Sequence, residues 1–451
     1  MFTHTAAVYT LGCKVNQYES EAITEALQNN GFTILDFTQR CDCYIINTCA
    51  VTAESVRKAR QMIRRARKTN PDAYILVTGC AAQLDAEAIA ALGTDYICGT
   101  KNKMSVVMQA LNLSDSGKPA GVNPIISVTD ATADIEPMQI TRFERTRAYV
   151  KIQDGCNSHC AYCIIPKLRG NVTSKKREDI IREVELLAEG GCPEVVLTGI
   201  ETSAYAYDLP LLLSELEHTE GLERIRLSSL DPSFMRRDFV DRIASLQKTA
   251  PHFHLSVQAG CDRTLRRMRR KYTCDTVRRN IAYIREQMPQ VLFSADIITG
   301  FPGETDEDFA ETLRFAEEIR FLHIHIFTYS KRPGTEAAEM HDQIPEEIKI
   351  QRSRQLAEVD RKNRASILKE ATEQKKPLLV LMENEENGYL YGHTANFMQV
   401  RCRAESGMYA SLHRRIVPVM PLYAENDCIT GKLPEYPTSE NKTDGTAYAA
   451  M

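Results

Sequence analysis

The chain has 451 residues, of which 43% are hydrophobic and 26% are charged, and these are ordinary proportions for a globular protein. Its length predicts about two to four domains. Its net charge of −4 excludes a globally basic protein, so any contact with nucleic acid has to come from local basic patches. No secretory signal and no apolar run of membrane-spanning length is present, so we expect a cytoplasmic protein without a membrane partner. Its fourteen cysteines are then thiols and metal ligands rather than disulfides.

Residues 1–112 alternate short apolar runs with helical patterns, which predicts a doubly wound parallel α/β domain. Three of the predicted strands lead directly into Cys13, Cys49 and Cys80. Because the carboxyl ends of parallel strands share the edge at which such sheets bind ligands, the three cysteines can converge. Any one of them alone would more often be a core residue. Together they indicate a three-cysteine site for an iron–sulfur cluster.

Three other cysteines of this region favour packing. Cys98 ends another apolar run and is the best rival ligand, although a buried cysteine is more often part of the core. Cys41 and Cys43 flank Asp42 at the front of a strand. Strand alternation predicts that both face the same way, at the wrong end of the sheet for ligation.

Residues 113–147 have no clear period and are expected to form a linker or wrap-around segment. Residues 148–370 contain a second α/β series and a connecting helix. Six β/α units are too few for a closed eight-stranded barrel, so we predict a partial (β/α)6 barrel, with its site at the strand carboxyl ends. The six strand-like runs lie near residues 149–152, 194–197, 224–227, 252–257, 292–297 and 323–327.

Cys156, Cys160 and Cys163 follow the first barrel strand in a C-x3-C-x2-C run. Three thiolates can hold three irons of a [4Fe-4S] cube and leave the fourth iron open for a ligand. Zinc is the main alternative, but zinc sites usually take four ligands from paired knuckles, and no second knuckle follows. The spacing resembles the signature of the radical S-adenosylmethionine (SAM) enzymes.

Residues 371–435 change to short strands separated by turn residues, which predicts a small β-barrel. This barrel resembles the TRAM domain, an RNA-binding module. Residues 436–451 are polar and rich in alanine, and we expect a disordered tail.

Over nearly its whole length the chain resembles the methylthiotransferase family of radical SAM enzymes. Residues 12–19 are most similar to the branch that acts on N6-threonylcarbamoyl-adenosine beside the tRNA anticodon. The isopentenyl-adenosine branch and the branch that modifies a ribosomal protein side chain carry different residues there. The segments that carry the resemblance are residues 10–19, 44–52, 77–80, 254–258, 265–272, 299–305 and 327–335.

The resemblance implies a transferase with two [4Fe-4S] clusters and SAM. The catalytic cluster, on Cys156, Cys160 and Cys163, cleaves SAM, and the resulting radical takes hydrogen from carbon 2 of the adenine. The second cluster, on the three N-terminal cysteines, holds or donates the sulfur that a second SAM methylates. The implied partners are the tRNA anticodon stem-loop, an electron donor such as flavodoxin or ferredoxin, and a sulfur source.

SAM also needs contacts at the barrel strand ends. The candidates are Gly199 and Glu201 for its amino group, Ser228 and Ser229 for the ribose, and Gln258, Gly300 and Gly303 for the ribose and base. A loop cap or a turn residue is the alternative for each. Residues 198–203 and 259–261 depart from the family pattern, so the resemblance does not fix the contacts there.

Two basic runs, within residues 57–68 and 263–271, contain no acidic residue between their arginines and lysines. A solvated helix face is the ordinary interpretation, but in an acidic chain they are candidates for tRNA phosphates. Another class of function stays open at this point: a non-enzymatic iron–sulfur carrier or sensor with an RNA-binding module.

Overall fold

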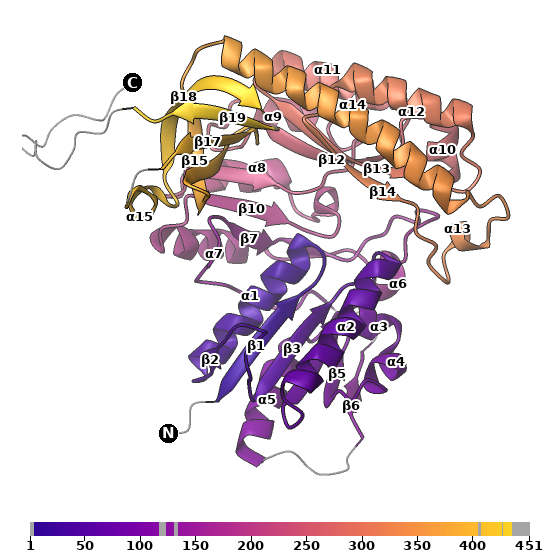
Figure 1. Ribbon diagram of the computed structural model, residues 1–451, viewed down its shortest axis with the longest axis vertical. Coiled ribbons are helices and arrows are strands. Elements are labelled where there is room, and N and C mark those ends of the chain that lie inside the picture. The colour runs from indigo at the N-terminus through magenta and orange to yellow at the C-terminus, as the bar shows by residue number, and fades with distance from the viewer. Residues whose placement is uncertain (1–3, 117–122, 130–133, 405–406, 426, 435–451) are drawn as a thin grey trace, which may run out of the picture. The chain divides into compact units, whose positions relative to one another are not determined.

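The computed structural model describes residues 4–116, 123–129, 134–404, 407–425 and 427–434. The chain divides into two compact units, residues 1–360 and 361–451. The first unit holds an N-terminal sheet and a partial barrel, and the second holds a small closed barrel (Figure 1). No helix of the described residues is long and apolar enough to cross a membrane.

The N-terminal sheet has six strands in the order β2-β1-β3-β4-β5-β6, and every neighbouring pair is parallel. The last strand lies inside the segment predicted as a linker, where three residues are too short a run to show a period. The strands are β1 (Thr5–Thr10), β2 (Thr33–Ile34), β3 (Cys43–Thr48), β4 (Tyr74–Gly79), β5 (Tyr96–Cys98) and β6 (Ile125–Ser127).

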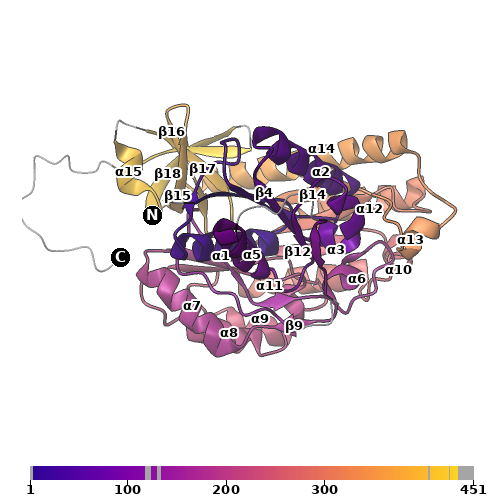
Figure 2. The ribbon, with the colours of Figure 1, turned by 90° about the horizontal axis from the view of Figure 1, so that it is seen from below.

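Both faces of this sheet are covered, which confirms the doubly wound arrangement. Alternate residues such as Ile45 and Leu76 meet helices α1 and α5, whereas Ile46 and Val77 meet α2 and α4. Figure 2 shows α1 and α5 lying together on one side. The helices are α1 (Lys14–Asn29), α2 (Ala53–Thr69), α3 (Cys80–Leu84), α4 (Ala86–Ala90) and α5 (Ser105–Ser116).

The prediction that Cys41 and Cys43 face the same way was wrong. Cys41 belongs to the hydrophobic cluster under α2, and Cys43 belongs to the cluster under α1 on the other face of the sheet. The strand begins only at Cys43, so alternation does not extend back to Cys41. Both side chains are buried, as expected of packing residues.

The partial barrel is built from two parallel three-stranded sheets with the orders β11-β10-β7 and β12-β13-β14. Isolated bridges from Ile225 to Thr249 and from Leu230 to Leu255 join them. The six strands therefore follow one another in chain order, at the positions that the apolar runs predicted. They are β7 (Ala148–Lys151), β10 (Glu194–Thr198), β11 (Arg224–Leu227), β12 (His252–Gln258), β13 (Leu292–Thr299) and β14 (His323–Thr328).

One large hydrophobic cluster fills the space between these strands and their helices, with Val150, Leu197 and Phe293 fully buried. A short antiparallel pair, β8 (Gln153–Asp154) and β9 (Thr173–Ser174), follows the first barrel strand. The helices are α6 (Ile165–Arg169), α7 (Arg177–Glu189), η1 (Thr202–Ala204), α8 (Leu209–Leu216), α9 (Arg237–Ile243), α10 (Asp262–Arg267), α11 (Cys274–Gln287), α12 (Asp306–Ile319) and α13 (Glu336–Glu339).

Helix α14 (Glu346–Glu373) begins in the first unit and ends in the second. The second unit is a closed barrel with the strand order β15-β16-β17-β19-β18 and helix α15 (Met408–Leu412), as the short strands predicted. The predicted disordered tail, residues 436–451, lies outside the described residues. The strands are β15 (Leu378–Glu386), β16 (Tyr389–Thr394), β17 (Gln399–Arg403), β18 (Ile416–Glu425) and β19 (Cys428–Lys432).

Candidate functional site

The barrel cysteines lie in one loop between β8 and α6. Cys156, Cys160 and Cys163 are free thiols, and each is partly exposed. Cys163 N donates to Cys160 O (3.0 Å), which holds these two cysteines in one turn. Burial raises the pKa of Cys163 to about 12, and the charges of Cys160 and Cys156 add to this shift. The loop is fixed to its surroundings, since Cys156 N donates to Gly170 O (3.0 Å) and Ala161 N to Met268 O (3.1 Å).

The N-terminal cysteines come from three different strand ends, and the sheet brings them together. Cys13 precedes α1, Cys49 follows β3, and Cys80 begins α3 directly after β4. Burial raises the pKa of Cys49 to about 11, and the charges of Cys80 and Cys13 contribute. Cys13 is solvent-accessible, yet burial is the main cause of the raised pKa of its thiol. Iron binds the thiolate, so cluster assembly at this site has to displace the thiol protons.

Glycines before two of these cysteines let the strand ends approach. Gly12 has φ of 100°, and a Cβ added to it would lie 2.8 Å from Cys49 Sγ. Gly79 has φ of 98°, and a Cβ there would lie 2.7 Å from Asn47 Oδ1 and 2.8 Å from Thr48 N. A side chain at either position would therefore push the cysteine loops apart.

Cys98 does not join this triad. Its side chain is fully buried among Ile23, Val106 and other residues of the core between the sheet and α1 and α5. Among the residues that the structure describes, no three His, Cys, Asp or Glu side chains are spaced to hold a single metal ion. A cube asks for a different spacing, because each thiolate binds its own iron at a separate corner.

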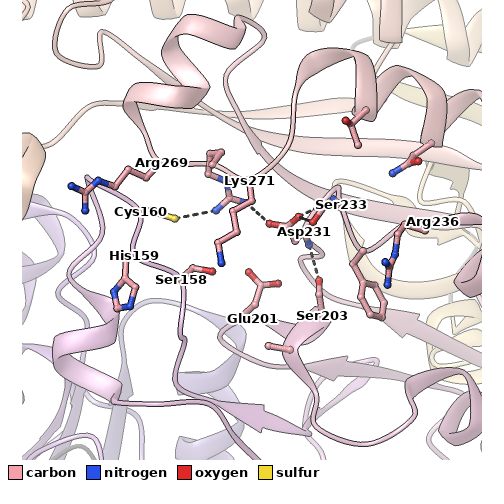
Figure 3. Close-up of a pocket in the computed structure, with 15 residues that line it drawn as sticks. Ser158, His159, Cys160, Glu201, Ser203, Asp231, Ser233, Arg236, Arg269 and Lys271 are labelled. Carbon is pink, nitrogen blue, oxygen red and sulfur yellow. Dashed lines mark hydrogen bonds and ion pairs between the residues drawn. The ribbon is translucent and has the colours of Figure 1, made fainter.

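A cavity of about 530 Å³ opens beside Cys160, at the carboxyl ends of the first barrel strands (Figure 3). Glu201 and Asp231 line it from two strand ends, and the Lys271 amino group points toward Ser158 and Glu201. The cavity therefore carries charges of both signs within a small volume.

Glu201 is the predicted residue that fits this cavity best. Its backbone N donates to Gln153 Oε1 (2.9 Å), but its own Oε1 is buried without a hydrogen-bond partner. Burial raises the pKa of Glu201, and the charge of Asp231 raises it further. A buried carboxylate oxygen without a donor costs free energy until a donor reaches it, and a ligand ammonium group would provide one.

Arg270 organises the other wall of the cavity. Its Nη1 donates to Cys160 Sγ (3.1 Å), its Nη2 to Asp231 Oδ2 (2.7 Å) and its Nε to Tyr272 OH (3.0 Å). One guanidinium thus connects the cysteine loop to the end of the third barrel strand. Sequence reasoning missed Asp231, although its place just after the third barrel strand was a usable signal, and it counted Arg270 only as part of a basic run.

Most arginines of the second basic run form ion pairs, and a contact of this run with tRNA stays a prediction. The acidic partners lie far away in the sequence, so these pairs could not be seen before folding. Arg263 pairs with Asp308, Arg267 with Asp342 (2.6 Å), Arg269 with Glu336 (2.5 Å) and Arg270 with Asp231.

Gly199, Ser228 and Ser229 do not line this cavity, although all three follow barrel strands. A Cβ on Gly199 would lie 2.6 Å from Gln153 Oε1, so the close approach of two strand ends explains this glycine. Ser228 is buried, and its Oγ lies 2.8 Å from Thr202 Oγ1. Ser229 is half-buried. Contacts from these residues to SAM stay predictions.

Gly300 and Gly303 belong to a turn after β13 and do not line this cavity either. Both have positive φ, and side chains there would collide with Lys349 and with Asp342. Packing against the region of α13 and α14 therefore accounts for both glycines, and their contacts to SAM also stay predictions.

A second cavity of about 220 Å³ lies beside the end of the cysteine loop, at Cys163. Gln258, the remaining predicted residue, lines it together with Cys163, Tyr162 and Phe327. Val51 and Thr52 line it from the N-terminal sheet, directly after Cys49. This cavity therefore lies next to segments that carry cysteines of both triads.

Two family models match the chain. Residues 5–99 match uncharacterized protein family UPF0004, and residues 150–316 match the radical SAM superfamily. The fold is similar to that of TsrM, a radical SAM methyltransferase from Kitasatospora setae, with a TM-score of 0.55 and 17% identity over 75% of this chain and 74% of that one. The barrel and its cysteine loop thus define a radical SAM protein.

Relatives narrow this class. Threonylcarbamoyladenosine tRNA methylthiotransferase MtaB from Bacillus subtilis (strain 168) is 38% identical over 90% of this chain and 92% of its own length. The MtaB protein of Aquifex aeolicus (strain VF5) is 38% identical over 84% and 93%. A tRNA-2-methylthio-N(6)-dimethylallyladenosine synthase from Carboxydothermus hydrogenoformans is 36% identical over 78% and 82%. The chain belongs to the methylthiotransferase family of radical SAM enzymes.

This membership confirms the resemblance found in the sequence. It makes the chain an enzyme that transfers a methylthio group, so the alternative of a non-enzymatic carrier or sensor is wrong. The family uses SAM and [4Fe-4S] clusters, and the residues present fit these groups. Two sets of three free thiols and an unpartnered carboxylate oxygen beside one set are the donors that such cofactors need.

Proposed function

We propose that this chain methylthiolates carbon 2 of N6-threonylcarbamoyl-adenosine next to the anticodon of tRNA. Relatives that bear this substrate in their names match the chain over most of its length. The observation that carries the proposal is the pair of cysteine triads, one at the barrel mouth and one at the edge of the N-terminal sheet. The chemistry needs two clusters, and two sites suited to them are present.

Cys156, Cys160 and Cys163 would hold the catalytic cluster, and Cys13, Cys49 and Cys80 would hold the second one. When bound, the first cluster and SAM supply a radical that can remove an unactivated hydrogen, and the second cluster supplies sulfur. Arg270 fixes the position of the Cys160 sulfur through its hydrogen bond to Sγ. The raised pKa of Cys163 means that iron must displace its proton during assembly.

The cavity beside Cys160 would bind SAM. Glu201 Oε1 is free to accept from an ammonium group, and the Lys271 amino group faces the same space, where a carboxylate would balance it. An amino acid moiety presents both groups on one carbon, so opposite charges on opposite walls fix its orientation. Asp231 is already held by Arg270, which leaves Glu201 as the carboxylate for the ligand.

The second cavity would receive the adenine. Tyr162, Phe327 and Tyr329 provide apolar walls suited to a planar base, and its volume of about 220 Å³ suits a single ring system. A base held there lies beside the loop of Cys163 and beside the segment that follows Cys49. A base must leave its stack to enter such a cavity, as other enzymes that modify bases require.

Helix α2 is a candidate surface for the anticodon stem-loop. Arg60, Arg64, Arg65 and Lys68 are exposed and make no ion pair within the described part of the chain. Exposed cations without partners can neutralise phosphates. The small barrel of residues 371–435 would add a TRAM-like RNA contact. A flavodoxin or ferredoxin would supply electrons, a separate donor would replace the sulfur, and tRNA as substrate would place the enzyme in the cytoplasm.

The test compares nucleosides of tRNA from a strain that lacks this chain with those of the same strain carrying it. We expect the 2-methylthio derivative of threonylcarbamoyl-adenosine to be lost in the deletion strain and restored by the unaltered chain. A variant with all three barrel cysteines replaced by alanine should not restore it. Loss of the dimethylallyl-adenosine derivative instead would assign the chain to that other substrate, and an unchanged profile would contradict both.

A further inference from the structure

A buried charged network lies between α1 of the N-terminal sheet and the first strands of the barrel. Each of its six charged side chains is at most 4% exposed. Four are cations and two are carboxylates, so the network holds two more positive charges than negative ones. Burial of an unbalanced charge costs several kcal/mol per ion, so a negative group is needed nearby. The members are Glu19, Lys101, Lys103, Lys151, Asp154 and Arg169.

Arg169 is the centre of this network, at the end of helix α6 that follows the barrel cysteines. Its Nη1 donates to Asp154 Oδ1 (2.9 Å) and Glu19 Oε1 (3.1 Å), and its Nη2 donates to Asn16 Oδ1 (2.6 Å). Its Nε is buried and has no hydrogen-bond partner. A fully buried guanidinium with one unused donor is costly unless an acceptor reaches it.

On the N-terminal side, Arg169 reaches the cysteine loops through Asn16. Asn16 Nδ2 donates to Leu11 O (2.7 Å) and Thr48 O (3.0 Å), and these carbonyls come just before the segments of Cys13 and Cys49. Asn16 Oδ1, which accepts from Arg169, is also 4.0 Å from Cys13 Sγ. One asparagine thus ties two cysteine loops together, and Arg169 fixes its orientation.

On the barrel side, the same arginine reaches the backbone of the other triad. Asp154 Oδ1, which accepts from Arg169, also accepts from Gly155 N (2.8 Å). The carbonyl of Gly170, the next residue after Arg169, accepts from Cys156 N (3.0 Å). The guanidinium therefore lies between the two backbones that carry the two sets of thiols.

We propose that Arg169 is a positioning residue for the N-terminal iron–sulfur cluster. It fixes the position of this cluster relative to the barrel, and its free Nε–H is the hydrogen-bond donor to the cluster. The inference rests on the proposed function, because it presumes a cluster on the N-terminal cysteines. Three thiolates on an oxidised cube leave a net negative charge, which offsets part of the surplus positive charge of the network. Hydrogen bonds to cluster sulfurs raise the reduction potential, so Arg169, which follows the barrel cysteines, raises the potential of the N-terminal cluster.

The experiment isolates the N-terminal cluster in a background that carries Cys156→Ala, Cys160→Ala and Cys163→Ala. Anaerobic reconstitution of this background should give about four irons per chain. Arg169→Gln in the same background should lower the midpoint potential and speed the loss of iron to a chelator roughly tenfold or more, as loss of an outer partner of a metal site does. Arg169→Lys keeps the positive charge but lacks the planar guanidinium with its several N–H donors. Its midpoint potential and its rate of iron loss should lie between those of the background and those of Arg169→Gln.

The matched control is Arg224→Gln in the same background. Arg224 is 4% exposed and pairs with Glu194 (3.0 Å) at the start of β11, the opposite end of the barrel strands from the cysteines. It should lower thermal stability and leave the potential and the chelation rate unchanged. Should Arg169→Gln fail to fold, Arg169→Lys alone decides, since unchanged potential and chelation in that variant overturn the inference. If the background that carries only the three cysteine replacements binds no iron, the proposed function itself fails.

Discussion

The two cysteine triads are encoded in different ways. The barrel triad occupies a single short loop, in which Cys163 N donates to Cys160 O (3.0 Å), so its arrangement is largely local. The N-terminal triad exists only when β1, β3 and β4 are paired, because each strand end delivers one cysteine. A local site tolerates changes elsewhere in the fold, whereas an assembled site depends on every strand that builds it.

The largest expected effect separates the two sites directly. Cys160→Ala removes the sulfur that Arg270 contacts, and we expect it to abolish SAM cleavage while the N-terminal cluster still assembles. Anaerobic reconstitution should give about four irons per chain, which corresponds to one cube. An iron content near zero would contradict independent sites. SAM cleavage is measured by chromatography of 5′-deoxyadenosine in the presence of a strong reductant.

Gly79→Ala tests the opposite dependence. Alanine at a φ of 98° is strained, and its Cβ would meet Asn47 and Thr48, so Cys80 should be displaced from the other two cysteines. We expect loss of the N-terminal cluster and retention of SAM cleavage at the barrel. Gly31→Ala is the control, since its φ of 86° imposes similar strain but nothing lies within 4 Å of the added Cβ. Equal cluster loss in both variants would show that strain alone, not contact between strand ends, is responsible.

Much of this contrast could be predicted from the sequence. Strand ends followed by Gly-Cys or Thr-Cys predicted which three cysteines meet, because parallel topology fixes which ends share an edge. The ion pair between Arg270 and Asp231 could not be predicted, because a long-range pair leaves no local pattern, although the place of Asp231 after a barrel strand marked it as a candidate. The ion pairs of the basic run at residues 263–271 could not be predicted for the same reason, since its acidic partners come from distant segments. Sequence patterns report local periodicity and topology but not side-chain pairing.

Glu201→Gln should weaken SAM binding to the barrel site about tenfold or more, because a neutral amide replaces a buried charged acceptor. The raised pKa of Glu201 gives a second signature. As the pH falls through that raised pKa, the Glu201 carboxylate becomes protonated and neutral. The affinity for SAM should therefore decrease at a higher pH than the pKa of an ordinary glutamate would give. The Gln variant should not show this decrease. Equilibrium binding of SAM to the reconstituted enzyme measures both. Glu54→Gln, at an exposed position of α2, is the control.

The basic runs repeat the contrast between the two regions. Most arginines of the barrel run are paired, whereas Arg60, Arg64 and Arg65 of α2 make no ion pair within the described part of the chain. Replacement of Arg60, Arg64 and Arg65 by alanine should weaken tRNA binding and lower the salt dependence of the binding constant by about one for each phosphate that is no longer neutralised. Filter binding at several salt concentrations measures the slope. Arg279→Ala, an exposed arginine of α11 that pairs with Asp275, should leave the slope unchanged. An unchanged slope in the triple variant would exclude α2 from the tRNA surface.

The smallest expected effect distinguishes residues within α2 itself. Arg67 turns inward, and its guanidinium donates to Ala73 O (2.8 Å), Gly93 O (2.5 Å) and Asp95 Oδ2 (2.8 Å). Because the side chain is about one quarter exposed, water offsets part of the effect of its removal, and Arg67→Ala should cost about 1–2 kcal/mol of unfolding free energy. The salt dependence of tRNA binding should not change, because this cation already serves the fold. A lowered salt dependence with unaltered stability would mean that Arg67 contacts phosphate. Arg67 would then belong to the tRNA surface together with Arg64 and would not serve the fold.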